Sequence, residues 1–557
     1  MDVHDEKFGN LIYTRRQYII PIWQREYSWY SPQWKDLWED LLTLYEQRFK
    51  KEKSQEISHF MGSLVLKPRE LGGVEKYVLI DGQQRISTLI VILVLLRNWA
   101  KERNPSVSNA IQDSYLLNRD IKKPDERFKL CPSVSDSPDF EKMMNGDTDL
   151  SGRFGDAYNF FFERLQDEEK KGTNGCEVEK LKEIIIDNLK FVEIILSEKD
   201  DSNRIFETLN SRGLELEPAD LLRNFFMMKI AKESDAESQY TSAWLPMQQK
   251  LVTAGNLTEY FRHYLAMGSQ APVKREEIYS TIDKKFKWST ESEIVDELRK
   301  LKDYSKYYQR LLFPTNEPND ELRARLEELN IWRVTTAYPL LLRAYTEKLS
   351  EEELGRLVDI ILSFVVRRYF CNVKTNSLNA IFTSLCDLDK SDPVRSIENK
   401  LKGFRWNYRW PDDEEFFKAF IDFPIYHGNY AKCFLVLASL ELSFGHPETV
   451  DFSNLTVEHV MPETITDWWK QHLGADWQRV HSGLKDTVGN LTFVAGPINP
   501  SLSNDPFPIK KKWFMKTKVE LSTSFQFLEN WQEADIRKRG EELAERAVQM
   551  WKRPASK

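Results

Sequence analysis

The stretch KYVLIDGQQRISTLIVILVLL, residues 76–96, decides the fold of the N-terminal part of the chain. Lys76–Ile80 has the apolar, β-branched pattern of a strand, and a strongly apolar helix is expected over Ile86–Ala100, directly after the turn. The first backbone N–H groups of such a helix, and the positive end of its dipole, face whatever lies over the turn. The sequence therefore predicts an anion or phosphate site at Asp81–Arg85.

The residues of this turn suit phosphate chemistry. Gly82 permits close backbone approach, and Arg85 can form a bidentate contact with a phosphate. Asp81 could hold a magnesium ion or orient a water molecule. The alternative is a structural corner in which Arg85 pairs with a carboxylate, and the string alone leaves both interpretations open.

Outward from this stretch, the pattern of the chain changes twice. A strand is expected at Ser63–Lys67, and a helix at Leu181–Lys190 precedes a strand at Phe191–Leu196. Residues 203–442 have the three- and four-residue apolar spacing of helices, and short strand-like runs with Gly, Pro and Asn follow from about residue 454. We therefore expect a multidomain α+β protein with an α/β domain, a large all-α middle region and a mixed C-terminal domain, at residues 1–230, 231–450 and 451–557.

Composition excludes several classes of protein. The net charge of −8 over 557 residues argues against a histone-like affinity for nucleic acid, but a local groove is compatible with the twelve Lys and Arg against eight Asp and Glu in residues 505–557. The five cysteines form no CxxC pair, which argues against a zinc ribbon and fits a reducing cytoplasm. Ile86–Leu96 is too short to span a bilayer, and the polar first residues do not resemble a signal peptide. We expect a cytoplasmic protein with no membrane contact.

Three further sequence blocks are informative together with the DGQQR turn. They are IPIWQREYSW at residues 20–29, HFMG at 59–62 and FETLNSRG at 206–213, which leads to DLLRN at 220–224. In this order the blocks resemble the DUF262 family, the ParB/sulfiredoxin-like domain of the GmrS type. The resemblance covers roughly residues 10–230.

The resemblance implies binding and hydrolysis of a nucleoside triphosphate, GTP or ATP. It places the nucleotide at Asp81, Gly82, Gln83, Gln84 and Arg85, with Asp81 and Arg85 active in hydrolysis. The same carry-over adds Gln24, Arg25, Asn210 and Arg212 to the site. There is no GxxxxGK[ST] string, so the nucleotide is not expected in a P-loop.

A second constellation lies near the C-terminus, in EHVMPE at residues 458–463, GNLTF at 489–493 and INPSLSN at 498–504. A hydrolytic nuclease must activate water and neutralise charge at a phosphodiester, tasks for one His and one divalent metal. His459 and Glu458 offer a base and an oxygen ligand, but strand alternation points them apart unless the strand bends or ends there. The alternative is a lone His in a polar, Asn-rich loop.

The ordered pattern EHxxP…GNLT…N…N resembles the DUF1524 family, HNH (ββα-metal) nucleases of the GmrD type, over about residues 450–520. The resemblance implies His459 as general base and Asn490 as the Asn that braces the loop. It implies a Mg²⁺ or Mn²⁺ site at Glu458 and Asn499, with Asn504 as the competitor of Asn499. The trailing DNA-binding Lys is one of Lys510, Lys511 and Lys512. Pro500 after Asn499 departs from the family pattern.

Both families in one chain resemble single-chain type IV restriction enzymes of phage defence. This implies an NTP-hydrolysing, metal-dependent HNH endonuclease that cuts or nicks modified or foreign DNA, with modified phage DNA as the expected partner. The alternatives are a non-catalytic module that binds modified DNA and blocks replication, or an HNH toxin that acts on RNA. A homo-oligomer is compatible with the sequence. We also hypothesise that nucleotide state controls the nuclease through the helical middle region.

Overall fold

The computed structural model describes most of the 557 residues. It leaves undescribed residues 51–56, 70–73, 120, 122, 134–135, 148, 173–174, 198–199, 201–216, 231–232, 390, 428, 446–449, 497–503 and 555–557. The chain forms two compact units. The first contains Met1–Thr258 and Tyr279–Lys302, and the second contains Glu259–Ile278 and Asp303–Lys557. The predicted boundaries at residues 230 and 450 stay a prediction.

The first unit is built on a mixed six-stranded sheet of order β1-β6-β3-β4-β2-β5. Neighbours pair antiparallel at β1–β6 and β3–β4, and parallel at β6–β3, β4–β2 and β2–β5. The strands are β1 (Asp2–Lys7), β2 (Arg16–Ile19), β3 (His59–Pro68), β4 (Glu75–Asp81), β5 (Leu130–Cys131) and β6 (Leu189–Ile195). The strands predicted at 63–67 and 76–80 are confirmed within β3 and β4, and the strand predicted at 191–196 is confirmed by β6, which ends one residue earlier.

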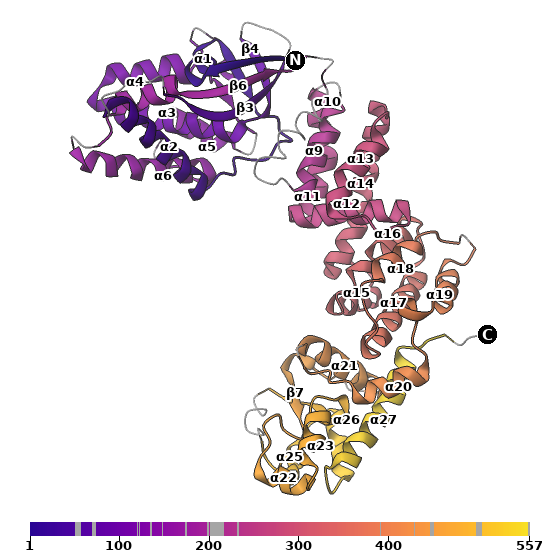
Figure 1. Ribbon diagram of the computed structural model, residues 1–557. Coiled ribbons are helices and arrows are strands. Elements are labelled where there is room, and N and C mark those ends of the chain that lie inside the picture. The colour runs from indigo at the N-terminus through magenta and orange to yellow at the C-terminus, as the bar shows by residue number, and fades with distance from the viewer. Residues whose placement is uncertain are drawn as a thin grey trace. The chain divides into compact units, whose positions relative to one another are not determined.

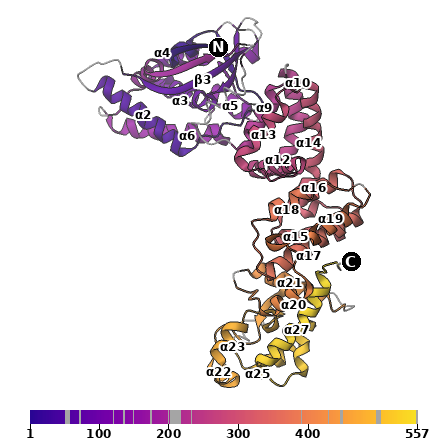
Figure 2. The ribbon, with the colours of Figure 1, turned by 45° about the vertical axis from the view of Figure 1, so that its right-hand side comes forward.

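Helix α3 (Gln83–Arg103) forms the centre of the core of this unit. Residues Ile86–Leu96 are all buried, because the helix lies between the sheet and the helices α2 (Ser31–Phe49) and α6 (Gly152–Lys170) (Figures 1 and 2). A helix covered on all sides needs no polar face, which explains the unbroken apolar run. The helix predicted over 86–100 is confirmed.

Shorter helices complete the first unit. They are α1 (Phe8–Tyr13), α4 (Pro105–Ile111), η1 (Gln112–Leu116), η2 (Pro124–Glu126), α5 (Ser137–Asn145), α7 (Val178–Glu183), η4 (Ile184–Asn188), α9 (Pro218–Met228), α10 (Glu233–Gln239), η5 (Tyr240–Trp244), α11 (Leu245–Leu251) and α13 (Ile278–Phe286). Two longer helices are α12 (Ala254–Ser269) and α14 (Glu291–Leu312), and the residue ranges of the two units divide within each of them.

The second unit begins as a helical region. It contains η6 (Arg275–Glu277), η7 (Pro314–Asn316), α15 (Asp320–Ile331), η8 (Thr335–Ala337), α16 (Tyr338–Thr346), α17 (Glu351–Phe370), α18 (Leu378–Ser384), α19 (Pro393–Gly403), η9 (Trp406–Tyr408), α20 (Asp413–Asp422) and α21 (Tyr430–Leu442). Arg367 of α17 is fully buried and donates to the carbonyl of Trp551, which follows the last helix of the chain. The helical middle region that the sequence predicts is confirmed for the described residues.

The C-terminal part of the second unit contains an antiparallel pair, β7 (Leu455–His459) and β8 (Leu491–Ala495), and helices around it (Figure 1). These are η10 (Phe452–Asn454), α22 (Asp467–Leu473), α23 (Trp477–Leu484), η11 (Val488–Asn490), α25 (Phe507–Phe514), α26 (Glu520–Thr523), η12 (Ser524–Phe527) and α27 (Glu533–Met550). The protein as a whole is thus mixed α and β. Among the described residues, no helix combines the length and apolarity that a membrane span requires.

Candidate functional site

The end of β7 carries the first candidate site. His459 is the last residue of β7 and pairs with Leu491, the first residue of β8, and the next N–H, that of Val460, donates to the carbonyl of Asn490 (2.9 Å). Consecutive strand residues point to opposite faces of a sheet. The side chains of Glu458 and His459 accordingly have different surroundings.

Glu458 is held by a lysine. Its Oε1 lies 2.6 Å from Nζ of Lys510 on α25, and the same Nζ donates to the main-chain carbonyl of His459 (2.7 Å). Lys510 is 0% exposed and Glu458 6% exposed. Burial raises the pKa of Glu458 against the opposing effect of Lys510, and burial also lowers the pKa of Lys510. The pair ties α25 to the strand that carries His459.

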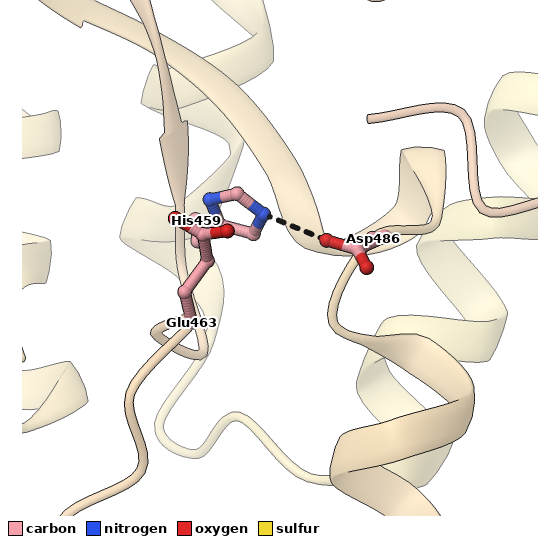
Figure 3. A group of neighbouring side chains, drawn as sticks. All are labelled: His459, Glu463 and Asp486. Atoms are coloured by element: carbon pink, nitrogen blue, oxygen red, sulfur yellow. Dashed lines mark hydrogen bonds and ion pairs between the residues drawn. The ribbon is translucent and has the colours of Figure 1, made fainter. Parts of the chain in front are cut away.

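The imidazole of His459 faces a second carboxylate instead. Nε2 of His459 lies 3.2 Å from Oδ1 of Asp486, which follows α23 (Figure 3). Both residues are buried, and the Tyr426 ring stands edge-on to the imidazole with 4.4 Å between ring centroids. The hydrogen bond from His459 is the main cause that lowers the pKa of Asp486. His459 is therefore not a lone surface histidine.

Glu463 completes a group that fits a metal ion. The ligand atoms of His459, Glu463 and Asp486 lie within 4.8 Å of one another, and all three side chains meet in Figure 3. One imidazole and two carboxylates suit a divalent cation such as Mg²⁺ or Mn²⁺, and Glu463 is open to solvent. Sequence reasoning missed both carboxylates. Glu463 follows Pro462 within the quoted motif, whereas Asp486 carries no local signal.

Asn490 uses its whole amide to brace the loops around this group. Oδ1 accepts from the N–H of Met461 (2.8 Å) and from Nε1 of Trp531 (3.0 Å), and Nδ2 donates to the carbonyls of Met461 and Lys485 (2.8 Å each). Asn490 is 0% exposed. Its oxygen and nitrogen are both used in hydrogen bonds to the segments around His459, which is compatible with the predicted bracing role.

A buried arginine forms hydrogen bonds with the main chain of the same loop. Nη1 of Arg539 on α27 donates to the carbonyls of Val488, Gly489 and Leu491, at 3.1, 2.8 and 2.8 Å. Burial lowers the pKa of Arg539 to about 9. A Cβ at Gly489 would meet a backbone oxygen of α27 at 2.3 Å, so the loop and the helix pack in direct contact. No sequence signal marks Arg539.

The structure separates the three predicted DNA-binding lysines. Lys510 is buried and paired with Glu458, so in this structure its ammonium is not exposed to solvent, and its assignment to DNA stays a prediction. Lys511 donates to the carbonyl of Leu528 (2.8 Å), and Lys512 is exposed. Asn504 is half-buried ahead of α25 and stays a predicted ligand. Asn499 lies outside the described residues.

In the N-terminal part of the chain, the DGQQR turn forms hydrogen bonds within itself and to the HFMG block. Gly82 precedes α3 at φ +96°, in the left-handed region. Arg85 donates from Nη1 to the carbonyl of Met61 (2.7 Å) and from Nη2 to Oδ2 of Asp81 (2.9 Å). A Cβ at Gly62 would lie 2.0 Å from Nη1 of Arg85, so the glycine of HFMG makes room for the guanidinium. The HFMG and DGQQR blocks thus form one packing unit.

The two glutamine-arginine blocks also bind each other. Nε2 of Gln24 donates to the carbonyl of Leu79 in β4 (2.6 Å). Gln84 accepts from the N–H of Ser28 (2.8 Å) and donates to the carbonyl of Glu26 (3.1 Å). Both glutamines are buried, and they fix the loop 20–29 against β4 and the start of α3. Gln83 donates to the carbonyl of Arg25 (3.3 Å) and extends this contact.

A pocket of about 580 Å³ opens on the outer side of this loop. Arg223 of α9 pairs with Asp220 (2.9 Å), and Arg153 pairs with Asp156 (3.4 Å). No hydrogen bond from the Arg25 side chain is found within the described part of the chain, and burial lowers its pKa. The lining residues are Ile22, Gln24, Arg25, Glu26, Tyr27, Ser28, Gly152, Arg153, Asp156, Asp220, Arg223, Tyr240 and Gln248.

Some of the residues of the predicted N-terminal site line this pocket. Gln24 and Arg25 line it as expected, whereas Asp81, Gly82, Gln83, Gln84 and Arg85 are not among the lining residues and shape the loop from behind. Asp81 and Arg85 pair with each other, which is the structural-corner interpretation of this string. Asn210 and Arg212 lie outside the described residues.

Two segments of the chain match models of known families. Residues 8–227 match the family of the GmrSD restriction endonuclease, N-terminal domain, and residues 410–546 match the GmrSD restriction endonucleases, C-terminal domain. The second match includes α20, α21 and Tyr426, ahead of the predicted boundary at residue 451. No curated protein matches the chain. The chain therefore joins the N-terminal and C-terminal domains of the GmrSD restriction endonucleases in one polypeptide, and it belongs to this family of DNA-cleaving enzymes.

Proposed function

We propose that this protein is a type IV restriction-like enzyme that cuts or nicks modified or foreign DNA with a metal-dependent HNH nuclease centred on His459. The observation that carries the proposal is the buried His459 beside the carboxylates of Asp486 and Glu463. The antiparallel pair β7–β8, with α25 tied to β7 through Lys510, supports a ββα unit at this position.

In the proposed reaction, His459 takes a proton from the attacking water. Glu463 and the second oxygen of Asp486 would hold Mg²⁺ or Mn²⁺ beside it. The cation, when bound, supplies Lewis-acid stabilisation of the charge that develops on the phosphate and on the leaving oxygen. Asn490 and Arg539 keep the loop behind Asp486 in place through hydrogen bonds to main-chain atoms. Glu458 remains a predicted ligand that Lys510 would have to release.

A cleavage assay with purified variants tests the proposal. Wild-type protein is incubated with Mg²⁺ or Mn²⁺ and with plasmid, modified phage DNA or total RNA. His459→Ala should lower the rate by about 10²–10⁴-fold, as for the loss of a general base. The matched control is His472→Ala, because His472 stacks on Trp468 away from the group. Undiminished cleavage by His459→Ala would refute the base, and cleavage of RNA alone would favour the toxin.

We propose further that the N-terminal pocket binds and hydrolyses a nucleoside triphosphate, GTP or ATP. Two of the three arginines that line the pocket pair with Asp156 and Asp220. The third, Arg25, offers five donors that the protein itself does not use among the described residues, and this supports an anionic ligand. Arg25→Ala should weaken nucleotide binding by at least about tenfold, since a charge-assisted hydrogen bond is lost.

The thermal unfolding temperature with and without nucleotide measures this effect. Without nucleotide, Arg25→Ala should be nearly as stable as the wild type, because the Arg25 side chain forms no hydrogen bond or ion pair within the described residues and its guanidinium is partly desolvated. Arg103→Ala serves as the control, since Arg103 pairs with Glu169 outside the pocket lining. Nicking with and without nucleotide, in the wild type and in Arg25→Ala, tests control of the nuclease. An unchanged thermal shift in Arg25→Ala would exclude this pocket.

A further inference from the structure

The imidazole of His459 is held from two sides. On one side Oδ1 of Asp486 lies 3.2 Å from Nε2. On another side the Tyr426 ring meets the imidazole at an interplanar angle of 79°, with 4.4 Å between centroids. Only 8% of the His459 side chain and 10% of the Asp486 side chain are exposed. Water therefore competes little for this hydrogen bond, and the ring has little room to turn.

Asp486 is itself fixed by its main chain. Its carbonyl accepts from the N–H of Tyr426 (3.3 Å), and a β-bridge joins the neighbouring Thr487 to Pro424. The hydroxyl of Thr487 donates to the carbonyl of Leu484 (2.8 Å). The segment that carries Asp486 is thus braced on both sides. Asp486 is placed by the fold, whereas Glu463 is exposed to solvent.

The hydrogen bond decides which ring nitrogen is free. Asp486 as a carboxylate can only accept, so the 3.2 Å hydrogen bond to its Oδ1 is donated by Nε2 of His459. Nε2 must then carry the proton, and the lone pair of the neutral imidazole lies on Nδ1.

We infer that Asp486 is a positioning residue for His459, which holds the imidazole with its proton on Nε2 and presents Nδ1 to the attacking water. The inference rests on the proposed function, because it requires His459 to act as the base. It separates Asp486 from a residue that only ligates a metal. A ligand acts whether or not His459 is present, whereas a positioning residue acts through His459.

A double-mutant cycle at Mn²⁺ concentrations that saturate each variant tests this difference. Asp486→Asn should lower kcat by on the order of 10²-fold when His459 is present, because Asn can present an N–H to the ring. In the His459→Ala background, the same substitution should change kcat less than about twofold. Asp486→Glu, which keeps an acceptor, should retain more activity than Asp486→Asn. Thermal unfolding and DNA binding of each variant report on folding.

Each result decides the matter. Equal factors for Asp486→Asn in the two backgrounds, or full recovery at saturating Mn²⁺, would overturn the positioning role and leave the proposed function intact. Undiminished cleavage by His459→Ala would refute the proposed function and the role of Asp486 with it. If Asp486→Asn does not fold, Tyr426→Leu replaces it in the same cycle. Its effect should likewise disappear in His459→Ala, and an equal effect in both backgrounds would count against positioning.

Discussion

Lys510 and Glu458 form a fully enclosed ion pair, with 2.6 Å between Nζ and Oε1, directly behind the main chain of His459. The pair joins α25 to the end of β7. Removing one partner of a buried pair leaves an uncompensated charge in a medium of low polarity, which is far more costly than the pair is stabilising. We therefore expect Lys510 to stabilise the fold around His459.

Lys510→Ala should lower the free energy of unfolding by about 3–5 kcal/mol, because Glu458 stays buried without a partner. Urea unfolding of the full chain, followed by tryptophan fluorescence, measures the change. Lys512→Ala removes an exposed lysine from the same helix and should stay within about 0.5 kcal/mol of the wild type. The double variant Lys510→Met, Glu458→Leu should recover most of the loss. A Lys510→Ala protein as stable as Lys512→Ala would contradict the enclosed pair.

The close packing of Gly62 against Arg85 leads to a second prediction about stability, in the N-terminal part of the chain. A Cβ at this position would lie 2.0 Å from Nη1 of Arg85, and φ is +98°. Gly62→Ala should therefore displace Arg85 from the carbonyl of Met61 and lower the free energy of unfolding by about 2–5 kcal/mol. Gly172→Ala is the matched control, because its φ is +59° and a Cβ there meets nothing within 4 Å.

The control variant Gly172→Ala carries only the backbone strain, about 1–2 kcal/mol. The difference between the two variants in urea unfolding isolates the clash with Arg85. Equal losses would mean that Arg85 moves aside at no cost, and the close packing of HFMG on DGQQR would then have no energetic weight.

The local sequence pattern was sufficient to predict the strands and helices around Asp81. It was insufficient to predict several side-chain contacts. The strand, turn and helix around Asp81 follow from apolar spacing and from Gly82, and the structure has them with slightly longer bounds. That Arg85 turns back to Asp81 was one of two open interpretations, since both a phosphate and a carboxylate satisfy a guanidinium.

The surroundings of His459 show why the sequence pattern did not predict its tertiary contacts. Asp486 lies 27 positions from His459 in a helix–loop segment with no motif of its own, and only the tertiary fold brings them together. Lys510 carries the same letter as Lys511 and Lys512, yet helical rotation turns it inward while Lys512 faces solvent. A charge run predicts exposure on average and does not identify the residue that the core encloses.

The position of Glu463 beside His459 and Asp486 leads to a prediction about Mn²⁺ binding. Glu463→Gln keeps the size of the side chain and removes the charge, so Mn²⁺ binding should weaken by at least about tenfold. Electron paramagnetic resonance of free Mn²⁺ measures this without reference to cleavage, and chelation with EDTA should stop cleavage by the wild type. Asp467→Asn, an exposed carboxylate outside the group, is the control. Unchanged Mn²⁺ affinity in Glu463→Gln would remove Glu463 from the site.

Lys510, Lys511 and Lys512 differ in exposure, and this difference leads to a prediction about how DNA affinity depends on salt. Each phosphate contact that is lost flattens the slope of log K against log salt concentration by about 0.9. Lys512 is exposed, so Lys512→Ala should flatten the slope by up to that amount, whereas Lys510 is buried and should contribute nothing. Fluorescence anisotropy with a short duplex over a range of KCl concentrations, in the His459→Ala background to prevent cleavage, measures the slopes.

Lys538→Ala is the matched control, because Lys538 is an exposed lysine on α27 and its loss changes the net charge equally. Lys510→Met with Glu458→Leu removes the enclosed pair without a net charge change, and its slope should equal that of its parent. If Lys512→Ala and Lys538→Ala behave alike, Lys512 is an ordinary solvated residue and DNA is held elsewhere. If the Lys510 variant flattens the slope as much as Lys512→Ala, Lys510 must leave Glu458 when DNA binds. Glu458 would then be released beside His459 at the moment when the substrate arrives.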